Sequence, residues 1–299
     1  MTADVRPAGF VSCVAELNEV RAREPQRIAS LLATRRRRDV FGPDGRLMIV
    51  ACDHPARGAL AASGRPTAMN DRRDLLERLA TALARPGVDG LLATADIVED
   101  LLLLGALEAK LVFASMNRGG LLGSRFEMDD RRTSYDVQGV VDARLEGAKM
   151  LIRIDVDDPG TVATLEQCGQ AVTDLNRAGL VALVEPFLSR RVEGSMVNDL
   201  SPDAVIKSVH IAQGLGASSA YTWLKLPVVA EMERVMDATT LPTLLLGGDP
   251  DGPPEVTYAR WQAALALPSV RGLVLGRTML YPADDDVAAA VDIAVSMVR

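Results

Sequence analysis

Lysine is rare in this chain of 299 residues, which has only four: Lys110, Lys149, Lys207 and Lys225. Lys225 closes the short apolar run YTWLKL. Aromatic and aliphatic surroundings disfavour the charged form of a lysine, and the neutral amine is the nucleophile that forms a Schiff base with a carbonyl carbon. The sequence therefore predicts that Lys225 attacks a carbonyl group. The alternative interpretation is an ion pair between Lys225 and Glu185 that closes the top of a barrel.

Glu185 follows another apolar run, LVALV. A carboxylate beside a reacting carbonyl moves protons during C–C cleavage, so we expect Glu185 to be a general acid and base. Its alternative role is that of the ion-pair partner of Lys225.

The run KMLIRIDV carries charged residues inside an apolar segment. Side chains alternate along a strand, so one face holds Lys149, Leu151, Arg153 and Asp155, and the other holds Met150, Ile152 and Ile154. By the same rule Trp223 shares the face of Lys225, and Leu224 lies on the opposite face. A second cation near Lys225 favours its neutral amine, and Arg153 is suited to hold a substrate hydroxyl or phosphate.

Two further runs, LLLGGDP and LVLGRTMLYP, end in glycines. Backbone N–H groups of glycine loops, together with a helix N-terminus, bind phosphate, and an arginine adds a forked, permanently charged donor. We therefore expect a phosphate site formed by Gly247, Gly248, Gly276 and Arg277. Tight turns are the alternative explanation of these glycines.

Eight apolar runs place these residues in a fold. They are LMIVA from Leu47, VDGLLA from Val88, LVFAS from Leu111, KMLIRIDV from Lys149, LVALVEPF from Leu180, YTWLKL from Tyr221, LPTLLLGG from Leu241 and RGLVLG from Arg271. Continuous apolar runs are typical of parallel strands covered on both faces, and helical patterns such as Asn70 to Ala84 lie between them. Their spacing of about 32 residues predicts a (β/α)8 TIM barrel. The segment ACDHPARG after the first run is no dinucleotide loop, which disfavours a doubly wound sheet.

The predicted barrel spans residues 46–299 and is preceded by a helical extension over residues 1–45. We expect helices from Val11 to Arg23 and from Pro25 to Arg38, which pack on the barrel and cover its floor. The basic cluster from Arg35 to Arg38 is expected to end a solvated helix.

Active sites of such barrels lie at the C-terminal ends of the strands. Polar residues that close the runs are therefore candidates, and they include Asp53, His54, Asn117, Arg118, Glu185, Lys225 and Arg277. The loop from Met116 to Tyr135 is long and contains glycine and arginine, as is typical of a substrate-covering lid or a subunit contact.

Composition excludes several functions. A formal charge of -7 argues against general affinity for nucleic acid. No apolar run approaches the roughly 20 residues that cross a bilayer, and the N-terminus lacks a signal pattern, so we expect a cytoplasmic protein that does not bind membranes. Two histidines and three separate cysteines argue against a metal site. No cofactor is expected.

These motifs resemble those of class I aldolases of the tagatose-bisphosphate and bacterial or archaeal fructose-bisphosphate type, and most closely an actinobacterial branch of them, over about Leu47 to Arg299. The resemblance implies an acid/base Glu at Glu185, a Schiff-base Lys at Lys225 and a phosphate-binding Arg at Arg277. It also implies roles for Asp53 and Lys149 in positioning hydroxyls and protons. The first-strand motif departs from the family, because Asp-His-Pro stands where relatives carry Asp-Gln-Arg or Asp-His-Gly. The part of the substrate that His54 and Arg57 contact is therefore left open.

The resemblance implies a metal-independent aldehyde-lyase that cleaves a phosphorylated ketose, or a keto-sugar acid phosphate, through a Schiff base. A homo-oligomer is expected. The alternatives are a non-catalytic sugar-phosphate sensor on the same barrel and an isomerase that uses Lys225 only electrostatically.

Overall fold

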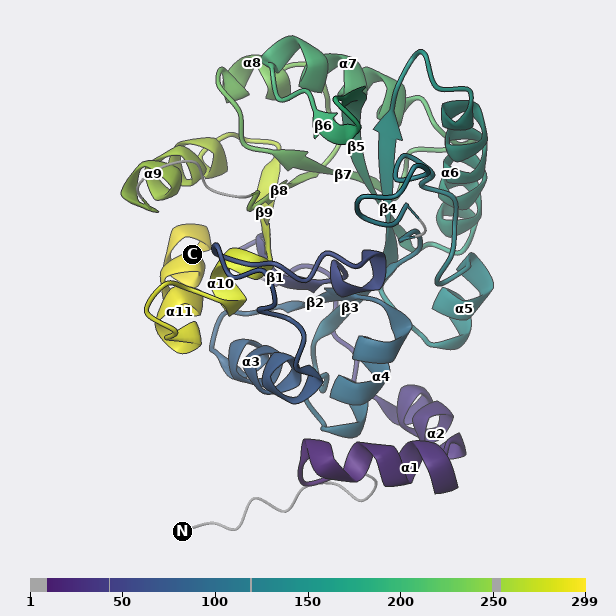
Figure 1. Ribbon diagram of the computed structural model, residues 1–299, viewed down its shortest axis with the longest axis vertical. Helices are drawn as coiled ribbons and strands as arrows, with labels where there is room; N and C mark the ends of the chain where they lie inside the picture. The colour runs from purple at the N-terminus through teal and green to yellow at the C-terminus, as the bar shows by residue number, and fades with distance from the viewer. Residues whose placement is uncertain (1–9, 43, 119, 249–253) are drawn as a thin grey trace.

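The computed structural model describes residues 10–42, 44–118, 120–248 and 254–299 (Figure 1). Eight parallel strands form the centre of the molecule: β1 (Leu47–Cys52), β2 (Gly90–Ala93), β3 (Leu111–Ser115), β4 (Gly147–Ile154), β5 (Val181–Val192), β7 (Thr222–Pro227), β8 (Thr243–Leu246) and β9 (Val270–Leu275). Their order is β4-β3-β2-β1-β9-β8-β7-β5, and β4 also pairs with β5. The sheet therefore closes on itself, and the predicted (β/α)8 TIM barrel is confirmed, with all eight predicted runs as its strands.

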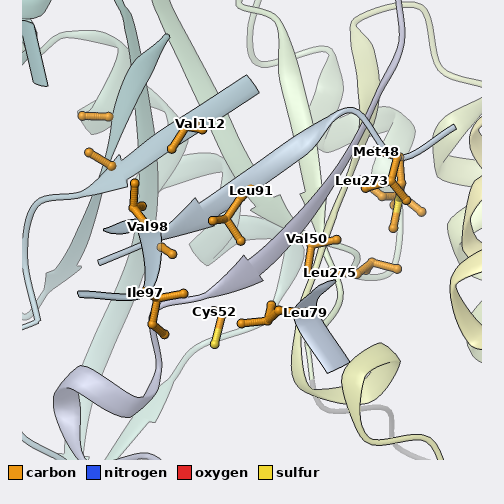
Figure 2. Packing of buried hydrophobic residues seen from close by; sticks show 14 of the residues in the cluster. Met48, Val50, Cys52, Leu79, Leu91, Ile97, Val98, Val112, Leu273 and Leu275 are labelled. Carbon is orange, nitrogen blue, oxygen red and sulfur yellow. The ribbon is translucent and has the colours of Figure 1, made fainter. Parts of the chain in front are cut away.

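Alternating side chains divide the core into two parts. Residues such as Ile49, Leu183 and Trp223 form a cluster inside the barrel. Their neighbours along the strands, such as Val50 and Leu224, belong to a second cluster between the strands and the helices. Figure 2 shows this outer cluster, in which side chains of β1 and β2 pack with those of α3 and α4. Both faces of the strands are thus apolar, as parallel strands require.

Helices surround the barrel. They are α1 (Leu17–Arg23), α2 (Gln26–Thr34), α3 (Arg72–Ala84), α4 (Ala95–Leu103), α5 (Val137–Asp142), α6 (Gly160–Arg177), α7 (Pro202–Gln213), α8 (Met232–Met236), α9 (Pro254–Leu265), α10 (Arg277–Leu280) and α11 (Val287–Val298). Local sequence explains where several of them begin. Asp71 caps α3 by accepting hydrogen bonds from the backbone N–H groups of Arg73 and Asp74, and Ser201 caps α7 before Pro202.

Residues 35–42 differ from the sequence-based prediction. Helix α2 ends at Thr34, and Arg35 is buried with its Nη2 3.0 Å from Glu146 Oε1. Arg37 also pairs with Glu146, and Arg38 pairs with Asp89. The prediction that this basic cluster ends a solvated helix is therefore wrong. The physical reason is that acidic residues just before β2 and β4 bind the arginines across the bottom of the barrel.

The segment after α2 also covers the barrel floor. Val40 packs against the interior cluster, and the ring of Phe41 stacks on Trp223 with 5.2 Å between the ring centroids. Helices α1 and α2 themselves lie beside α4, outside the barrel (Figure 1). The division of the chain at residues 45 and 46 stays a prediction.

One additional element stands above the barrel. The C-terminal half of β5 runs on past the barrel and pairs with antiparallel β6 (Ser195–Asn198). Glu193 and Gly194 form the turn, with φ angles of 49° and 84°, as is typical of a two-residue hairpin. The apolar pattern of β5 did not predict this hairpin, although the Glu-Gly pair was a local signal for it. Among the described residues, no helix combines the length and hydropathy needed to span a bilayer.

Candidate active site

A cavity of about 740 Å³ lies at the C-terminal ends of the strands. Ten of the predicted site residues line it: His54, Arg57, Arg118, Arg153, Glu185, Lys225, Gly247, Gly248, Gly276 and Arg277. Asp53 and Lys149 are fully buried beside it, and Asn117 does not line it. The fold therefore gathers residues that lie more than 200 positions apart in the sequence at one end of the barrel.

Lys225 lies on the interior face of β7. Trp223 belongs to the interior cluster and Leu224 to the outer one, as strand alternation predicts. The Lys225 side chain is 5% exposed, and its Nζ lies 2.6 Å from Glu185 Oε1. Lys225 therefore forms the ion pair that the sequence offered as an alternative, and it also lines the cavity. The ion pair with Glu185 and a position at the cavity therefore do not exclude each other.

The ion pair extends into a row of alternating charges. Glu185 Oε2 lies 3.0 Å from Lys149 Nζ, and Lys149 Nζ lies 2.8 Å from Asp53 Oδ2. Arg118 donates from Nε to the same Asp53 oxygen at 2.9 Å. The row thus alternates in sign, and its two ends, Lys225 and Arg118, both line the cavity. Its members are Lys225, Glu185, Lys149, Asp53 and Arg118.

This arrangement keeps the two carboxylates ionised. Burial by itself raises the pKa of Glu185, but Lys149 and Lys225 outweigh burial and lower that pKa to about 2. Burial likewise raises the pKa of Asp53, but Arg118 and Lys149 hold it well below its ordinary value. Burial lowers the pKa of Lys149, and Arg118 lowers it further. Glu185 is therefore ionised at neutral pH.

Asp53 is held by groups that fix its orientation. Ser115 Oγ donates to Asp53 Oδ2 at 2.9 Å, the same oxygen that Lys149 and Arg118 bind. The other oxygen, Oδ1, accepts no hydrogen bond from the described residues and lies 3.6 Å from His54 Nδ1. Burial lowers the pKa of His54 to about 3, so its ring is neutral. The neutral imidazole of His54 is thus available at the cavity to polar groups of a ligand.

Asn117 holds the loop that follows β3. Its Nδ2 donates to the carbonyl groups of Asp130 and Leu151, and its Oδ1 accepts from the Leu151 N–H at 2.9 Å. Because these three bonds use its amide, Asn117 joins the loop to β4 rather than facing the cavity.

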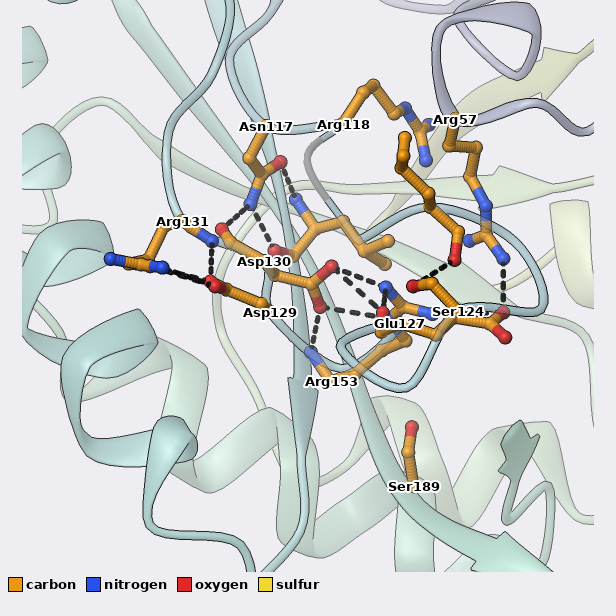
Figure 3. A network of polar contacts seen from close by, with 12 residues as sticks. Arg57, Asn117, Arg118, Ser124, Glu127, Asp129, Asp130, Arg131, Arg153 and Ser189 are labelled. Carbon is orange, nitrogen blue, oxygen red and sulfur yellow. Dashed lines mark hydrogen bonds and ion pairs between the residues drawn. The ribbon is translucent and has the colours of Figure 1, made fainter. Parts of the chain in front are cut away.

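Two acidic residues of the loop bind arginines at the cavity. Figure 3 shows Arg153 against Asp130, with 2.7 Å between Nη2 and Oδ1. Arg57 Nη2 lies 2.8 Å from Glu127 Oε1. Glu127 lines the cavity with Leu122 of the same loop. The loop from Met116 to Tyr135 is therefore fixed over the edge of the barrel mouth by charged contacts.

Close packing explains Gly247 and Gly276, which lie on the side of the cavity opposite this loop. A Cβ atom on Gly276 would lie 2.6 Å from the Ala51 carbonyl oxygen of β1, and one on Gly247 would lie 2.8 Å from Leu275. Arg277 lines the cavity, as do Thr257, Arg260 and Trp261 of α9. Asp249, which the sequence groups with these glycines, lies outside the described residues. Small residues thus bring backbone and two arginines to one side of the cavity.

Several lining or supporting residues were not predicted: Ser115, Glu127, Asp130, Met196, Asn198, Thr257, Arg260 and Trp261. Ser115 is the last residue of β3 and had a positional signal. For Glu127 and Asp130, the only signal in the sequence was that arginines lie nearby in the chain. Within the described parts of the chain, no group of three or more His, Cys, Asp or Glu side chains is placed to hold a metal ion.

The geometry allows a defined chemistry. A carbonyl compound in the cavity meets the Lys225 amine, with the ionised Glu185 next to it to exchange protons. Lys149 stabilises the charge of Glu185 from behind, and Asp53 in turn pairs with Lys149. Gly247, Gly248, Gly276 and Arg277, called the glycine wall below, line one side of the cavity, and backbone N–H groups with a guanidinium can bind an anionic group.

Known structures share this fold. Cgl0159 from Corynebacterium glutamicum (Brevibacterium flavum) is 55% identical, with a TM-score of 0.93, over 99% of this chain and 98% of that one. A Schiff base-forming fructose-1,6-bisphosphate aldolase is 18% identical, with a TM-score of 0.65, over 91% of this chain and 100% of that one. An archaeal fructose-1,6-bisphosphate aldolase is 16% identical, with a TM-score of 0.64, over 91% and 99%. At these low identities the two aldolases show likeness of fold alone.

A search of curated protein sequences found no match. A family model described as Cgl0159-like matches residues 45–295. This match covers the whole barrel except its last residues, and it agrees with the 55% identity to Cgl0159. The chain therefore belongs to the Cgl0159-like family.

Proposed function

We propose that this protein is a class I aldolase that cleaves a phosphorylated ketose through a Schiff base on Lys225. The observation that carries the proposal is the position of the Lys225 amine, which lines the cavity and lies 2.6 Å from a buried carboxylate of Glu185. The shared fold of a Schiff base-forming aldolase supports it.

The first step is the activation of the amine. Glu185 is ionised and lies 2.6 Å from the Lys225 nitrogen, so it receives the proton that Lys225 gives up to become nucleophilic. The neutral amine then adds to the ketose carbonyl carbon. Glu185 returns its proton to the carbinolamine hydroxyl group, which leaves as water, and a protonated imine forms. The imine takes over the positive charge that Lys225 carried, so the contact with Glu185 is preserved.

The second step is the cleavage. A base removes the proton from the hydroxyl group on the far carbon of the bond that breaks, and this carbon leaves as an aldehyde. The electron pair of the broken C–C bond moves onto the imine, which becomes a neutral enamine. We assign this proton transfer to Glu185, and the paired Lys149 balances its changing charge. Protonation of the enamine carbon and hydrolysis of the imine release the second product and restore Lys225.

The phosphate group of the ketose is assigned to the wall of Gly247, Gly248, Gly276 and Arg277. Backbone N–H groups and a guanidinium are suited to a dianion. The expected homo-oligomer and the cytoplasmic location stay predictions.

Borohydride trapping tests the proposal. The protein is incubated with dihydroxyacetone phosphate, a ketone that forms the same imine, then reduced and digested. The expected result is one added mass on the peptide that contains Lys225. An adduct at another lysine, or none with any ketose that the protein cleaves, would overturn the mechanism. A sensor would bind sugar phosphates and raise the melting temperature without turnover.

A further inference from the structure

The two carboxylate oxygens of Asp53 differ in their contacts. Oδ2 binds Ser115, Lys149 and Arg118, whereas Oδ1 is buried and accepts no hydrogen bond from the described residues. A buried polar atom without a partner is rare and calls for an explanation. His54 Nδ1 lies 3.6 Å from Oδ1, slightly too far for a hydrogen bond, so a shift of less than 1 Å in the ring would supply the missing donor.

The ring of His54 also belongs to the cavity. Its side chain lines the cavity and is 26% exposed. Neither of its nitrogens is a buried atom that lacks a partner, so solvent reaches the ring. A hydrogen bond from Nδ1–H to Asp53 leaves Nε2 with a free electron pair. A carboxylate that fixes the tautomer of a histidine in this way prepares the other nitrogen for proton transfer.

Few other groups at the cavity exchange protons near neutral pH. Besides Lys225, the described lining residues of this kind are His54, Glu127 and Glu185, since arginine keeps its proton. Glu127 is held in an ion pair with Arg57, and Glu185 lies against the Lys225 nitrogen. His54 is therefore the neutral group among them.

The proposed reaction includes a proton transfer to carbon, because the enamine carbon that has lost the aldehyde must gain a hydrogen. We propose that His54 is the catalytic residue that carries this proton between water and the enamine carbon, with its Nδ1–H bound to Asp53. This inference rests on the proposed function and adds a second proton-transfer group to Glu185.

The protons and electrons of this step balance. After the aldehyde has left, Glu185 gives the hydroxyl proton to water, and His54 takes up a proton from water. Nε2 then passes it to the enamine carbon. The electron pair of the C=C bond forms the new C–H bond, the nitrogen electron pair restores the C=N bond, and His54 is neutral again.

The charges around His54 change in favour of this step. Burial lowers the pKa of His54, and the charge of Lys225 is among those that lower it further, whereas Asp53 raises it. In the enamine the Lys225 nitrogen is neutral, so this opposing charge is gone when His54 takes up its proton. The positive charge then lies beside Asp53.

Hydrogen exchange at carbon tests the role of His54. In D2O without an aldehyde, removal and return of a proton replaces hydrogen on the hydroxymethyl carbon of dihydroxyacetone phosphate by deuterium, which proton NMR follows. His54→Gln should slow this exchange at least about 10²-fold and still give the borohydride adduct on Lys225 at saturating ligand. His210→Gln removes the exposed histidine of α7 and is the matched control, with exchange and trapping unchanged.

Chemical rescue separates proton transfer from a structural role. His54→Ala leaves space for an imidazole, and added imidazole should raise its exchange rate at least about tenfold without changing that of His54→Gln. Absence of rescue would refute the inference. The tautomer is tested by 15N NMR of the reduced adduct, in which the His54 signals are assigned by their loss in His54→Gln. A proton on Nδ1 is expected, and one on Nε2 alone would contradict the bond to Asp53.

Two kinds of failure are distinguishable. An adduct on Lys225 in both the wild type and His54→Gln, with equal exchange rates, would refute the role of His54 and leave the proposed function intact. No adduct on Lys225 in the wild type would refute the proposed function, and the role of His54 with it.

Discussion

Glu185 joins the two lysines of the site, because one of its oxygens lies 2.6 Å from Lys225 and the other lies 3.0 Å from Lys149. Strands β4 and β7 both pair with β5, which carries Glu185. The carboxylate therefore lies between cations from the neighbouring strands on each side. Removing Glu185 leaves the buried Lys225 without its carboxylate partner, which is costly, whereas after removal of Lys225 the carboxylate still pairs with Lys149.

Substitution of the nucleophile should abolish catalysis and leave the fold intact. In Lys225→Met, a side chain of similar length replaces the amine, and we expect cleavage to fall at least about 10³-fold, since no imine forms. Borohydride trapping followed by mass analysis is the measurement. Lys207→Met on the exposed side of α7 is the matched control and should keep full trapping. Substantial cleavage by Lys225→Met would exclude a Schiff base at this position.

Glu185 should make stability depend on acid pH. Its pKa is lowered from 4.5 to about 2 in the folded protein, so its carboxylate stabilises the fold above pH 4.5, and this stabilisation is lost as pH falls from 4.5 toward 2. Urea denaturation of the wild type and Glu185→Gln at pH 6 and pH 3 measures the effect. The wild type should lose more stability than the variant between the two values. Parallel losses would show that Glu185 has no lowered pKa.

The catalytic effect of Glu185→Gln should be separate from its effect on stability. The amide retains the size of the side chain but is no base, so cleavage should fall by about 10²- to 10⁴-fold. Rates are measured at a temperature where both proteins are folded by circular dichroism. A loss below threefold would assign the proton transfers to another group.

Asn117 should matter for the loop rather than for ligand contacts. Asn117→Ala removes three hydrogen bonds to Asp130 and Leu151 and should cost about 1–3 kcal/mol of stability. Limited proteolysis should then cut within residues 116–135 faster than in the wild type. Gln138→Ala, which removes an exposed contact to Asp142, is the control. Unchanged proteolysis together with weaker phosphate binding would instead place Asn117 in the binding site.

Gly276 should tolerate no side chain. Gly276→Ala places a Cβ 2.6 Å from the Ala51 carbonyl oxygen, so β9 and the glycine wall must shift, and affinity for dihydroxyacetone phosphate should drop at least about tenfold. Gly169→Ala within α6, where the nearest atom is 3.7 Å away, should be neutral or stabilise by about 1 kcal/mol. Thermal melts and calorimetric titration measure both effects. Normal binding by Gly276→Ala would argue against a ligand at this wall.

The repeating pattern made the barrel predictable, and the ends of its strands made much of the site predictable. The sequence identified three site residues, Lys149, Glu185 and Lys225, because each is a charged residue within or directly after an apolar run. The alternation of side chains along a strand then placed Lys149 and Lys225 in the barrel interior. Asn117 follows a strand in the same way as Arg118, yet its amide binds backbone. Position after a strand does not specify whether a side chain turns toward the cavity or back to the chain.

The remaining differences come from contacts between distant segments. Arg35 leaves its helix because Glu146, more than 100 residues later, binds it at the barrel floor. Glu127 and Asp130 become part of the site because they meet Arg57 and Arg153. Such pairings depend on which loops the closed barrel brings together, and local sequence patterns do not contain that information.

The closed floor also has a consequence for the order of events at Lys225. Below this residue the barrel is filled by buried side chains such as Leu183, Leu244 and Trp223, and Phe41 stacks on Trp223 from beneath. In the described part of the chain, the cavity at the barrel mouth is therefore the route for substrate, products and water. In the proposed reaction, the water that hydrolyses the imine enters where the aldehyde has just departed. Release of the aldehyde thus comes before hydrolysis, and an aldehyde that stays bound protects the covalent intermediate.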